Sequence, residues 1–413
     1  MKKCICTLVS VILVALSAHT LRSATGRMFD TPESIAKPGS GEVSAPDLIT
    51  SPGWHKLVGT ALKGGQENAS PCPPNNFGNY GYRYADDCGA LINAWNSAIV
   101  DPQRNRLILW GGGHADYGGN EIYSLELSRN PPALLRLNPP SPANNTNSCV
   151  ETLSDGRPNS RHTYDSLAYF PNQDEMFSFG GSLNHCGFAG NATWTLQLSS
   201  VLASCAPNCT ANWTKQNPKN VPAASYGITT AYDTVHDILW LNDESTLWSY
   251  DPIANQFTKR ANVVNCYHGT AVFDPADEYL IHLDGCAPRL SYWSTAAKSD
   301  LSQKNPPVDP SCAGLFSSTY NGNSGYPGVA WDPIDKVVVT YPNGGNVLYL
   351  LNPKTWTCTT ETYGSTQGVD YPQDDAATEG GGTFKHFNYF TKLDLYVLCN
   401  DSRFDCWYLR RRK

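Results

Sequence analysis

The chain repeats one pattern along most of its length, and this repetition limits the folds open to it. Each copy has an apolar segment, a turn often built on Asp-Pro, and a second apolar segment. The copies occupy residues 93–113, 163–182, 226–243, 267–285, 326–345 and 381–401. Aligned on their turns, they share a register through Pro102, Pro171, Thr234, Pro275, Pro333 and Tyr389. The mean spacing of about 57 residues is typical of propeller-type repeats with added loops.

Further strands follow the two apolar segments. A third is expected at 121–127, 192–198, 245–250, 289–293, 346–351 and 406–411, and a fourth at 212–216, 255–260 and 355–360. Four strands per repeat predict one blade each of an all-β propeller. A blade alone has two open edges and cannot bury both faces, so stacking in a ring is what stabilises it.

The two ends of the repeat array predict how the ring closes. The last copy stops at its third strand, and segment 54–59 has the Trp-x-Lys pattern of the fourth strand at 213–215. We expect this N-terminal strand to complete the last blade. The direct count is six blades, and seven if residues 60–92 contribute strands. Two unrelated β-sandwiches are the alternative, which the common register disfavours.

Composition agrees with this interpretation. The chain has 413 residues, 40% hydrophobic and 16% charged, with 34 Gly, 29 Pro and 11% aromatics, which favours short strands and many turns over a helical bundle or disorder. Length alone would suggest two to three domains, whereas the repeats indicate one. The net charge of −7 argues against nucleic acid as a partner. We expect a monomer.

The first residues resemble a secretion signal. Met1, Lys2 and Lys3 form a basic start, and an apolar run extends from Ile5 to Leu16. This run of about 12 residues is shorter than the roughly 20 that a membrane span needs. We therefore expect a signal peptide at 1–17, a linker or propeptide-like segment at 18–43, and the propeller at 44–413. The protein would be secreted, with no membrane attachment.

Cysteine usage fits export. Of the 14 cysteines, Cys4 and Cys6 fall in the signal, and the even number that remains predicts disulfides. Zinc is disfavoured because no CxxC pair occurs. Six N-x-S/T sequons would suit glycosylated surface loops in a eukaryotic host, at Asn68, Asn144, Asn191, Asn208, Asn212 and Asn400.

The repeats resemble a known group. The Gly-Gly after the second strand, the aromatic third strand and the Trp-x-Lys fourth strand are similar to kelch repeats of galactose-oxidase-like propellers. The resemblance covers nearly the whole mature chain. It implies the fold and says little about function, because propellers host many chemistries.

Candidate functional residues gather where the topology brings them together. The innermost strand of a blade starts at one face, and the loop between strands two and three returns there, so polar residues at both places should converge on the channel mouth. Segment 111–121 carries His114, Asp116 and Tyr117 among five glycines that permit close approach. The second blade starts with Arg161, His162 and Tyr164. The further candidates are Asn93, Asn96, Asp165, His185, Tyr226, Tyr267, His268, Tyr326, Lys385 and His386.

Four of the nine histidines (His114, His162, His185 and His268) occupy these positions. Such a cluster beside Arg and Tyr favours function over packing. It suits β-elimination in an acidic polysaccharide. A base removes the C5 proton of a uronic acid, a cation or amide neutralises the carboxylate, and an acid protonates the leaving oxygen.

The layout also resembles propeller polysaccharide lyases of the ulvan and rhamnose–glucuronate type. Those pair an inner-strand His with a loop His, then use a Tyr and an Arg from the following blade and another Tyr beyond. On this sequence, His114 matches the loop His, Tyr164 or His162 the first Tyr, and Tyr226 the later Tyr. Asn93 and Asn96 stand where the family has His. His185 stands near the expected Arg, while Arg161 lies elsewhere.

The resemblance yields an assignment of roles. His114 is the expected base, Tyr164 the acid, and Arg161, His162 and Asn96 the groups on the carboxylate. Tyr117, His185, Tyr226, Tyr267 and His268 are expected to bind the substrate. No cofactor is needed.

Three alternatives remain. Tyr267-His268 resembles the copper-binding pair of copper-radical oxidases, although the added C-terminal domain that usually supplies a further His is not present after the last repeat. Paired carboxylates could hydrolyse glycosides, from among Asp116, Glu121, Asp165, Asp243 and Glu244. A non-catalytic kelch module could bind glycan through Trp and Tyr platforms. Calcium binding by Asp116 with Glu121 is a further alternative, but their spacing matches no known loop.

Overall fold

The structure is a computed structural model. It describes residue 48 and residues 50–146, 148–266, 268–297, 299–316, 319–320, 323–324, 326–364, 371–372 and 381–412. All of them belong to one compact unit, Val43–Lys413. The expected signal peptide at 1–17 and the segment at 18–43 lie outside the described residues.

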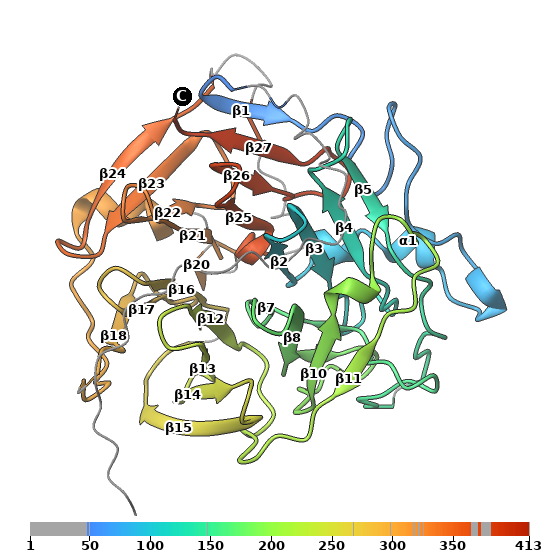
Figure 1. Cartoon of the computed structure of the whole chain (residues 1–413), viewed down its shortest axis with the longest axis horizontal. Coiled ribbons are helices and arrows are strands. Elements are labelled where there is room, and N and C mark those ends of the chain that lie inside the picture. Colours follow the sequence, from blue (N-terminus) through green and yellow to red (C-terminus); the bar gives the residue numbers. More distant parts are fainter. Residues whose placement is uncertain are drawn as a thin grey trace, which may run out of the picture. The chain divides into compact units, whose positions relative to one another are not determined.

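Six antiparallel sheets stand around a central axis as the blades of a propeller (Figure 1). Blade 1 contains β2 (Ser97–Asp101), β3 (Arg106–Trp110), β4 (Tyr123–Glu126) and β5 (Ala133–Arg136). Blade 2 contains β7 (Ala168–Phe170), β8 (Glu175–Phe179), β10 (Thr193–Gln197) and β11 (Trp213–Lys215). Blade 3 contains β12 (Thr229–Asp233), β13 (Ile238–Asn242), β14 (Thr246–Asp251) and β15 (Gln256–Asn262).

Blade 4 contains β16 (Thr270–Asp274), β17 (Tyr279–Leu283) and β18 (Leu290–Ser294). Lys304 pairs with Tyr292 of β18 in a single bridge at the place of a fourth strand. Blade 5 contains β21 (Gly328–Asp332), β22 (Val337–Tyr341), β23 (Val347–Asn352) and β24 (Thr357–Thr362). Blade 6 contains β25 (Phe387–Phe390), β26 (Leu395–Leu398), β27 (Trp407–Arg410) and β1 (Gly53–Lys56).

The predicted ring closure is confirmed. Strand β1 pairs antiparallel with β27, from Gly53 opposite Arg410 to Lys56 opposite Trp407. The first and last strands of the propeller thus lie side by side (Figure 1). The count of six blades is confirmed as well. Residues 60–92, all of them described, form helices and no strand.

The elements outside the blades are short. The helices are η1 (Phe77–Asn79), α1 (Tyr84–Asp87), α2 (Ala90–Asn93), η2 (Leu198–Ser200), η3 (Pro310–Phe316) and η5 (Phe384–His386). Two small ribbons pair β6 (Arg161–His162) with β9 (Ser182–Leu183), and β19 (Thr319–Tyr320) with β20 (Asn323–Ser324). No helix in the described parts of the chain has the length and apolar character to cross a membrane.

The Asp-Pro turns have a direct structural reason. The Asp101 carboxylate accepts hydrogen bonds from the N–H groups of Gln103 and Arg104, which holds the hairpin between β2 and β3. The same capping recurs at Asp233, Asp274 and Asp332. In the sixth blade the predicted register was wrong by two residues. Phe390 pairs with Leu395, which places Thr391, not Tyr389, where the other repeats have Pro or Thr.

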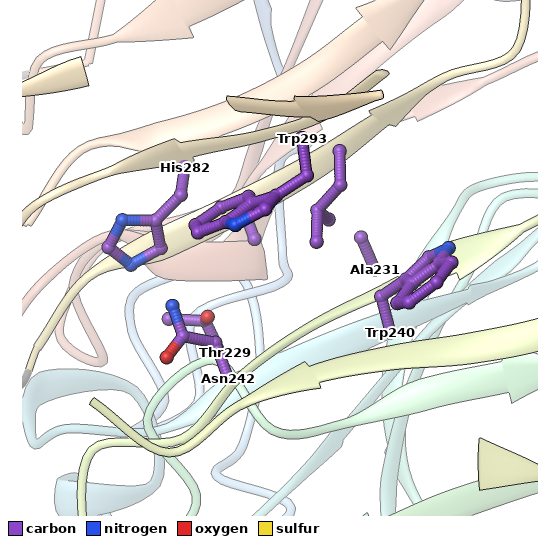
Figure 2. Close-up of a pocket in the computed structure, with 8 residues that line it drawn as sticks. Thr229, Ala231, Trp240, Asn242, His282 and Trp293 are labelled. Atoms are coloured by element: carbon purple, nitrogen blue, oxygen red, sulfur yellow. The ribbon is translucent and has the colours of Figure 1, made fainter. Parts of the chain in front are cut away.

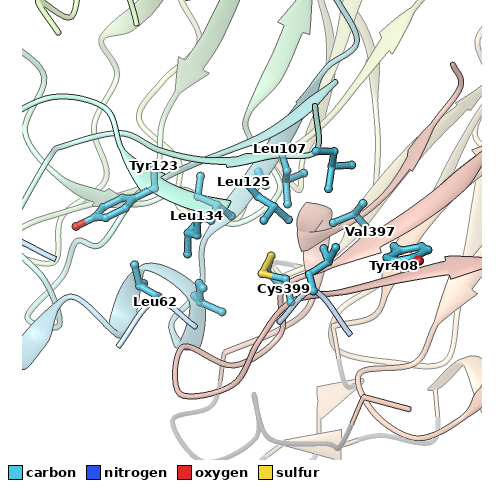
Figure 3. Packing of buried hydrophobic residues seen from close by; sticks show 14 of the residues in the cluster. Leu62, Leu107, Tyr123, Leu125, Leu134, Val397, Cys399 and Tyr408 are labelled. Atoms are coloured by element: carbon cyan, nitrogen blue, oxygen red, sulfur yellow. A yellow bond between two sulfur atoms is a disulfide. The ribbon is translucent and has the colours of Figure 1, made fainter. Parts of the chain in front are cut away.

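Apolar side chains fill the spaces between neighbouring blades. Figure 3 shows the interface between the first and last blades, where Leu107 and Leu125 pack with Val397 and Tyr408. Leu62, from the segment before the first blade, belongs to the same fully buried cluster. Burial of such side chains contributes about 1.5–3 kcal/mol each, so the seam that joins the two ends of the ring is packed like the other seams.

The twelve cysteines that follow Cys6 are all paired, which confirms the disulfide prediction. The bonds join Cys72–Cys88, Cys149–Cys186, Cys205–Cys209, Cys266–Cys286, Cys312–Cys358 and Cys399–Cys406. Such bonds persist in oxidising compartments, so they fit an extracellular or periplasmic protein.

Candidate functional site

The glycine run 111–113 seats the first blade's loop directly on the second blade. Gly113 has φ +71. A Cβ there would lie 2.0 Å from the backbone nitrogen of His162, so only glycine lets the loop come this close to the second blade. The Ser160 hydroxyl accepts a hydrogen bond of 2.9 Å from the Gly113 N–H. As a result the exposed His114 ring comes within 5.6 Å, centroid to centroid, of the His162 ring.

His162 and Asp116 form a hydrogen-bonded pair. His162 Nε2 lies 2.5 Å from Asp116 Oδ2, and the two side chains are 2% and 39% exposed. Burial lowers the pKa of His162 from its ordinary value, although the carboxylate of Asp116 opposes that shift. His162 is therefore neutral near pH 7 and is oriented by a carboxylate that reaches solvent.

Aromatic and imidazole rings continue from His162 across the mouth. The Tyr164 ring meets the His162 ring edge-on at 5.8 Å and stacks on His268 at 5.0 Å. His268 Nδ1 and the Tyr326 hydroxyl are hydrogen-bonded at 3.1 Å. Burial lowers the pKa of His268 to about 3. Trp95 lies within 5.2 Å of His162 and 6.0 Å of His268. Residues before the inner strands of blades 1, 2, 4 and 5 thus form one continuous cluster.

Lys385 closes the central channel below this cluster. Its Nζ donates to the carbonyls of Asp165, Leu167 and Thr230 at 2.6, 2.9 and 2.8 Å, and it lies 2.7 Å from the Thr230 hydroxyl. The Asp165 carboxylate accepts from the Ala271 N–H at 3.0 Å and lies 3.6 Å from Nζ. Burial lowers the pKa of Lys385 and raises that of Asp165. The lysine thus connects blades 2, 3 and 6 across the axis.

Three of the predicted site residues are buried and bonded within the protein. Arg161 is 0% exposed, and its guanidinium donates to Glu151 Oε2 at 3.1 Å and to the Gly180 carbonyl at 3.1 Å. The Asn96 side chain accepts from the N–H groups of Gly112 and Thr163 and donates to the Ala90 carbonyl. Tyr117 donates to Glu121 and is fully buried.

The remaining predictions differ in outcome. His185 is half-buried, and its N–H donates to the His114 carbonyl at 2.7 Å, so it supports the loop of His114. Tyr226 is 41% exposed and makes no ring contact with this cluster among the described residues. Tyr267 lies outside the described residues.

A polar cavity of about 720 Å³ adjoins the His162–Asp116 pair. Its lining residues are Lys63, Asp86, Asp87, Gly89, Ala90, Asn93, Ala115, Asp116, Ser402 and Arg403. Arg403 is hydrogen-bonded to Asp401 at 2.8 Å while its side chain stays 51% exposed. Lys63 donates to the backbone carbonyls of Ala85 and Asp86.

The sequence-based search missed both of these cations. Arg403 lies between β26 and β27, in a loop that returns to the mouth face and so obeys the rule used to find the other candidates. Lys63 belongs to the segment before the first blade, for which the repeats give no register.

The alternative chemistries find less support in the geometry. Among the described residues, one group of three possible metal ligands lies close together, Cys266, Asp284 and Cys286, and its two sulfurs form a disulfide. Three of the five acidic residues named for hydrolysis are engaged separately: Asp116 with His162, Glu121 with Tyr117 and Tyr123, and Asp165 with Thr270 and Ala271.

A further histidine is buried between blades 3 and 4. Figure 2 shows His282 beside Trp293, facing Thr229 and Asn242, in a space that has no room for a water molecule. Burial lowers the pKa of His282 to about 4. Since all four side chains are buried, this group belongs to the packing between blades.

Comparisons with known proteins find structures that resemble this chain only distantly. No protein-family model matches the sequence, so the kelch resemblance gains no support there, and no curated protein matches it. An auxiliary nutrient binding protein from Bacteroides ovatus is 8% identical with a TM-score of 0.47, over 77% of this chain and 69% of that chain. One from Bacteroides thetaiotaomicron is 13% identical with a TM-score of 0.47, over 78% and 70%. A streptogramin B lyase is 9% identical with a TM-score of 0.42, over 78% and 94%.

Proposed function

We propose that this protein is a secreted polysaccharide lyase that cleaves a uronic-acid-containing polysaccharide by β-elimination. The observation that carries the proposal is the exposed His114 ring beside the His162–Asp116 pair. The two residues that follow His114 line the 720 Å³ cavity. An acid–base group at the edge of a polar cavity is what a polymer-cleaving site requires.

The reaction divides among these residues as follows. His114 removes the C5 proton of the uronic acid, and the electron pair forms the C4–C5 double bond as the C4–O bond breaks. Tyr164, edge-on to His162, donates its proton to the leaving oxygen. General acid–base help of this kind is worth about 10²–10⁴ in rate.

The cavity supplies the charge that the elimination needs. The substrate carboxylate must be neutralised as negative charge develops at C5. Arg161 and Asn96 are fully buried and bonded within the protein. We therefore replace them in this role by Arg403, which bonds Asp401 but lines the cavity and stays 51% exposed, with Lys63 beside it. Guanidinium groups match carboxylates by two parallel hydrogen bonds, which also orients the sugar ring. His162, neutral and held by Asp116, positions His114 and the substrate.

Export is part of the proposal. The basic and apolar N-terminal residues suit a signal, and the six disulfides fit an oxidising compartment.

The test is a screen of acidic polysaccharides for ultraviolet absorbance from unsaturated uronates. Polygalacturonate, alginate and a glucuronate-containing polymer serve as substrates. We expect absorbance to rise with at least one of them. Arg403→Ala should lower kcat and raise KM, because Arg403 both binds the carboxylate and neutralises the charge that develops at C5. Tight glycan binding with no absorbance change would favour a non-catalytic binding module instead.

A further inference from the structure

A second cavity occupies the central channel on the side away from His114. It has a volume of about 440 Å³ and is lined by residues from all six inner strands. Its mouth lies among the exposed hairpin residues Thr234, Pro333 and Thr391. Its inner end is Lys385, whose neighbour in the chain, Phe384, belongs to the aromatic cluster at the opposite mouth. The two cavities therefore lie on opposite faces of the propeller.

The wall of this channel is mostly apolar, with Thr230 and Asn388 as polar members besides Lys385 and the threonines at the mouth. Small aliphatic side chains form it in every blade but the sixth: Ala98, Ile99, Leu167, Ala168, Ala231, Ala271, Val272, Val329 and Ala330. Toward the hairpins, aromatic residues at one register position of the repeats line it, namely Tyr169, Tyr232, Phe273, Trp331 and Tyr389. Aromatic faces of this kind bind flat apolar surfaces.

The charged group that lines the channel is already hydrogen-bonded within the protein. Of the described residues that line it, Lys385 alone is charged. An ammonium has three N–H donors, and those of Lys385 are taken up by the three carbonyls and the hydroxyl of blades 2 and 3. Neither an anion nor a cation would therefore find a free partner at the inner end. The volume of the cavity suits a small organic ligand, because the pockets of such ligands measure about 300–1,000 Å³.

We propose that this channel is a second binding site, which takes an uncharged aromatic small molecule. The ligand enters between the hairpins, stacks on the aromatic rings and covers the alanines of the wall. This site is separate from the proposed lyase site and does not depend on it.

The test uses the mature protein and 2-naphthol as probe, with binding measured by calorimetry. We expect saturable binding to one site. Thr234→Trp places a large ring over the mouth and should weaken binding at least tenfold, whereas Val235→Trp, at the exposed neighbouring position outside the lining, should leave it unchanged. Because Thr234 is exposed, the substitution avoids the core, and thermal unfolding checks that both variants fold.

Two further arms make the result decisive. Thr391→Trp covers the mouth from the sixth blade and should act like Thr234→Trp, and the charged analogue 2-naphthoate should bind more weakly than 2-naphthol. Absence of saturable binding, equal binding to both Trp-covered variants and the wild type, or stronger binding of 2-naphthoate would overturn the proposal.

Discussion

His162 Nε2 lies 2.5 Å from Asp116 Oδ2, so a buried imidazole from the second blade is held by a partly exposed carboxylate from the first. The contact exists because Gly113 lets the Asp116 loop lie against the backbone at His162. Two opposing influences act on the imidazole. Burial disfavours its charged form and Asp116 favours it, and burial is the stronger.

Removal of the Asp116 charge should lower the pKa of His162 further. In Asp116→Asn burial and the neighbouring His114 still lower the pKa, while the substituted side chain keeps its shape and one oxygen. The pKa is measured from the His162 ring signals in an NMR titration. A rise in the pKa of His162 in the variant would show that Asp116 does not stabilise the charged imidazole.

Loss of the His114 imidazole should abolish activity on the polymer identified in the screen. We expect His114→Ala to lower kcat by about 10²–10⁴, since the base is removed. His236→Gln is the matched control, because His236 lies in the hairpin turn between β12 and β13, at the face away from the mouth. Equal activity of His114→Ala and the control would rule out His114 as the base.

Acid should weaken the fold through buried histidines. Burial lowers the pKa of His386 to about 3 from an ordinary 6.5, so between these values the unfolded chain binds more protons than the folded one. The free energy of unfolding should therefore fall as pH drops through this window, with a slope of up to about 1.4 kcal/mol per pH unit from His386. His282, with its pKa lowered to about 4, acts in the same direction over a narrower range.

Denaturant unfolding at several pH values measures this slope. His386→Phe removes the titrating group from a fully buried position, and its stability should depend less steeply on pH than that of the wild type. A slope unchanged by the substitution would show that His386 does not carry the effect.

The last residues should contribute strongly to stability. Arg411 is 4% exposed and bonds Asp332 and Glu361 of the fifth blade at 2.6 and 2.7 Å. Removing one partner of a buried ion pair costs about 3–5 kcal/mol, and Arg412, which also bonds Asp332, should reduce that cost. We expect Arg411→Ala to lower the free energy of unfolding by about 2–4 kcal/mol. Arg83→Ala, which breaks an exposed ion pair, is the control and should change little.

Glycosylation, if the chain is expressed in a eukaryotic host, should be selective. Asn191, Asn208 and Asn212 are exposed around the outer strands of the second blade, whereas Asn144 and Asn400 are only 8% and 7% exposed. Since a glycan needs a surface loop, mass spectrometry of peptides should find modification at the first three and none at the last two. Modification of Asn400 would show that this segment is accessible to the glycosylating enzyme before folding buries it.

The repeats made most of the fold predictable. The Asp-Pro turns and alternating strands specify the blades because a capped hairpin followed by a third strand recurs locally, and the ring closure follows from Trp54 and Lys56 matching Trp213 and Lys215. The register failed only at the sixth blade, where no Asp-Pro marks the turn and Thr391 takes the place of the proline.

The site was predictable in position and less so in detail. The rule for the mouth face brought His114, His162, Tyr164 and His268 together. This rule could not predict which side chains turn inward. Arg161 points to Glu151 because Glu151 and the Gly180 carbonyl accept the hydrogen bonds of its guanidinium. The rule could not identify Lys63, because the repeats give no register for the segment 60–92.

The proposed mechanism is elimination by His114 at the cavity that Asp116 lines. The most direct measurement is cleavage of the polymer in heavy-oxygen water, followed by mass spectrometry of the products. Elimination should give unsaturated ends that carry no heavy oxygen, because it adds no water across the broken bond. Saturated products that carry one heavy oxygen at the new end would contradict it and would show that the enzyme is a hydrolase.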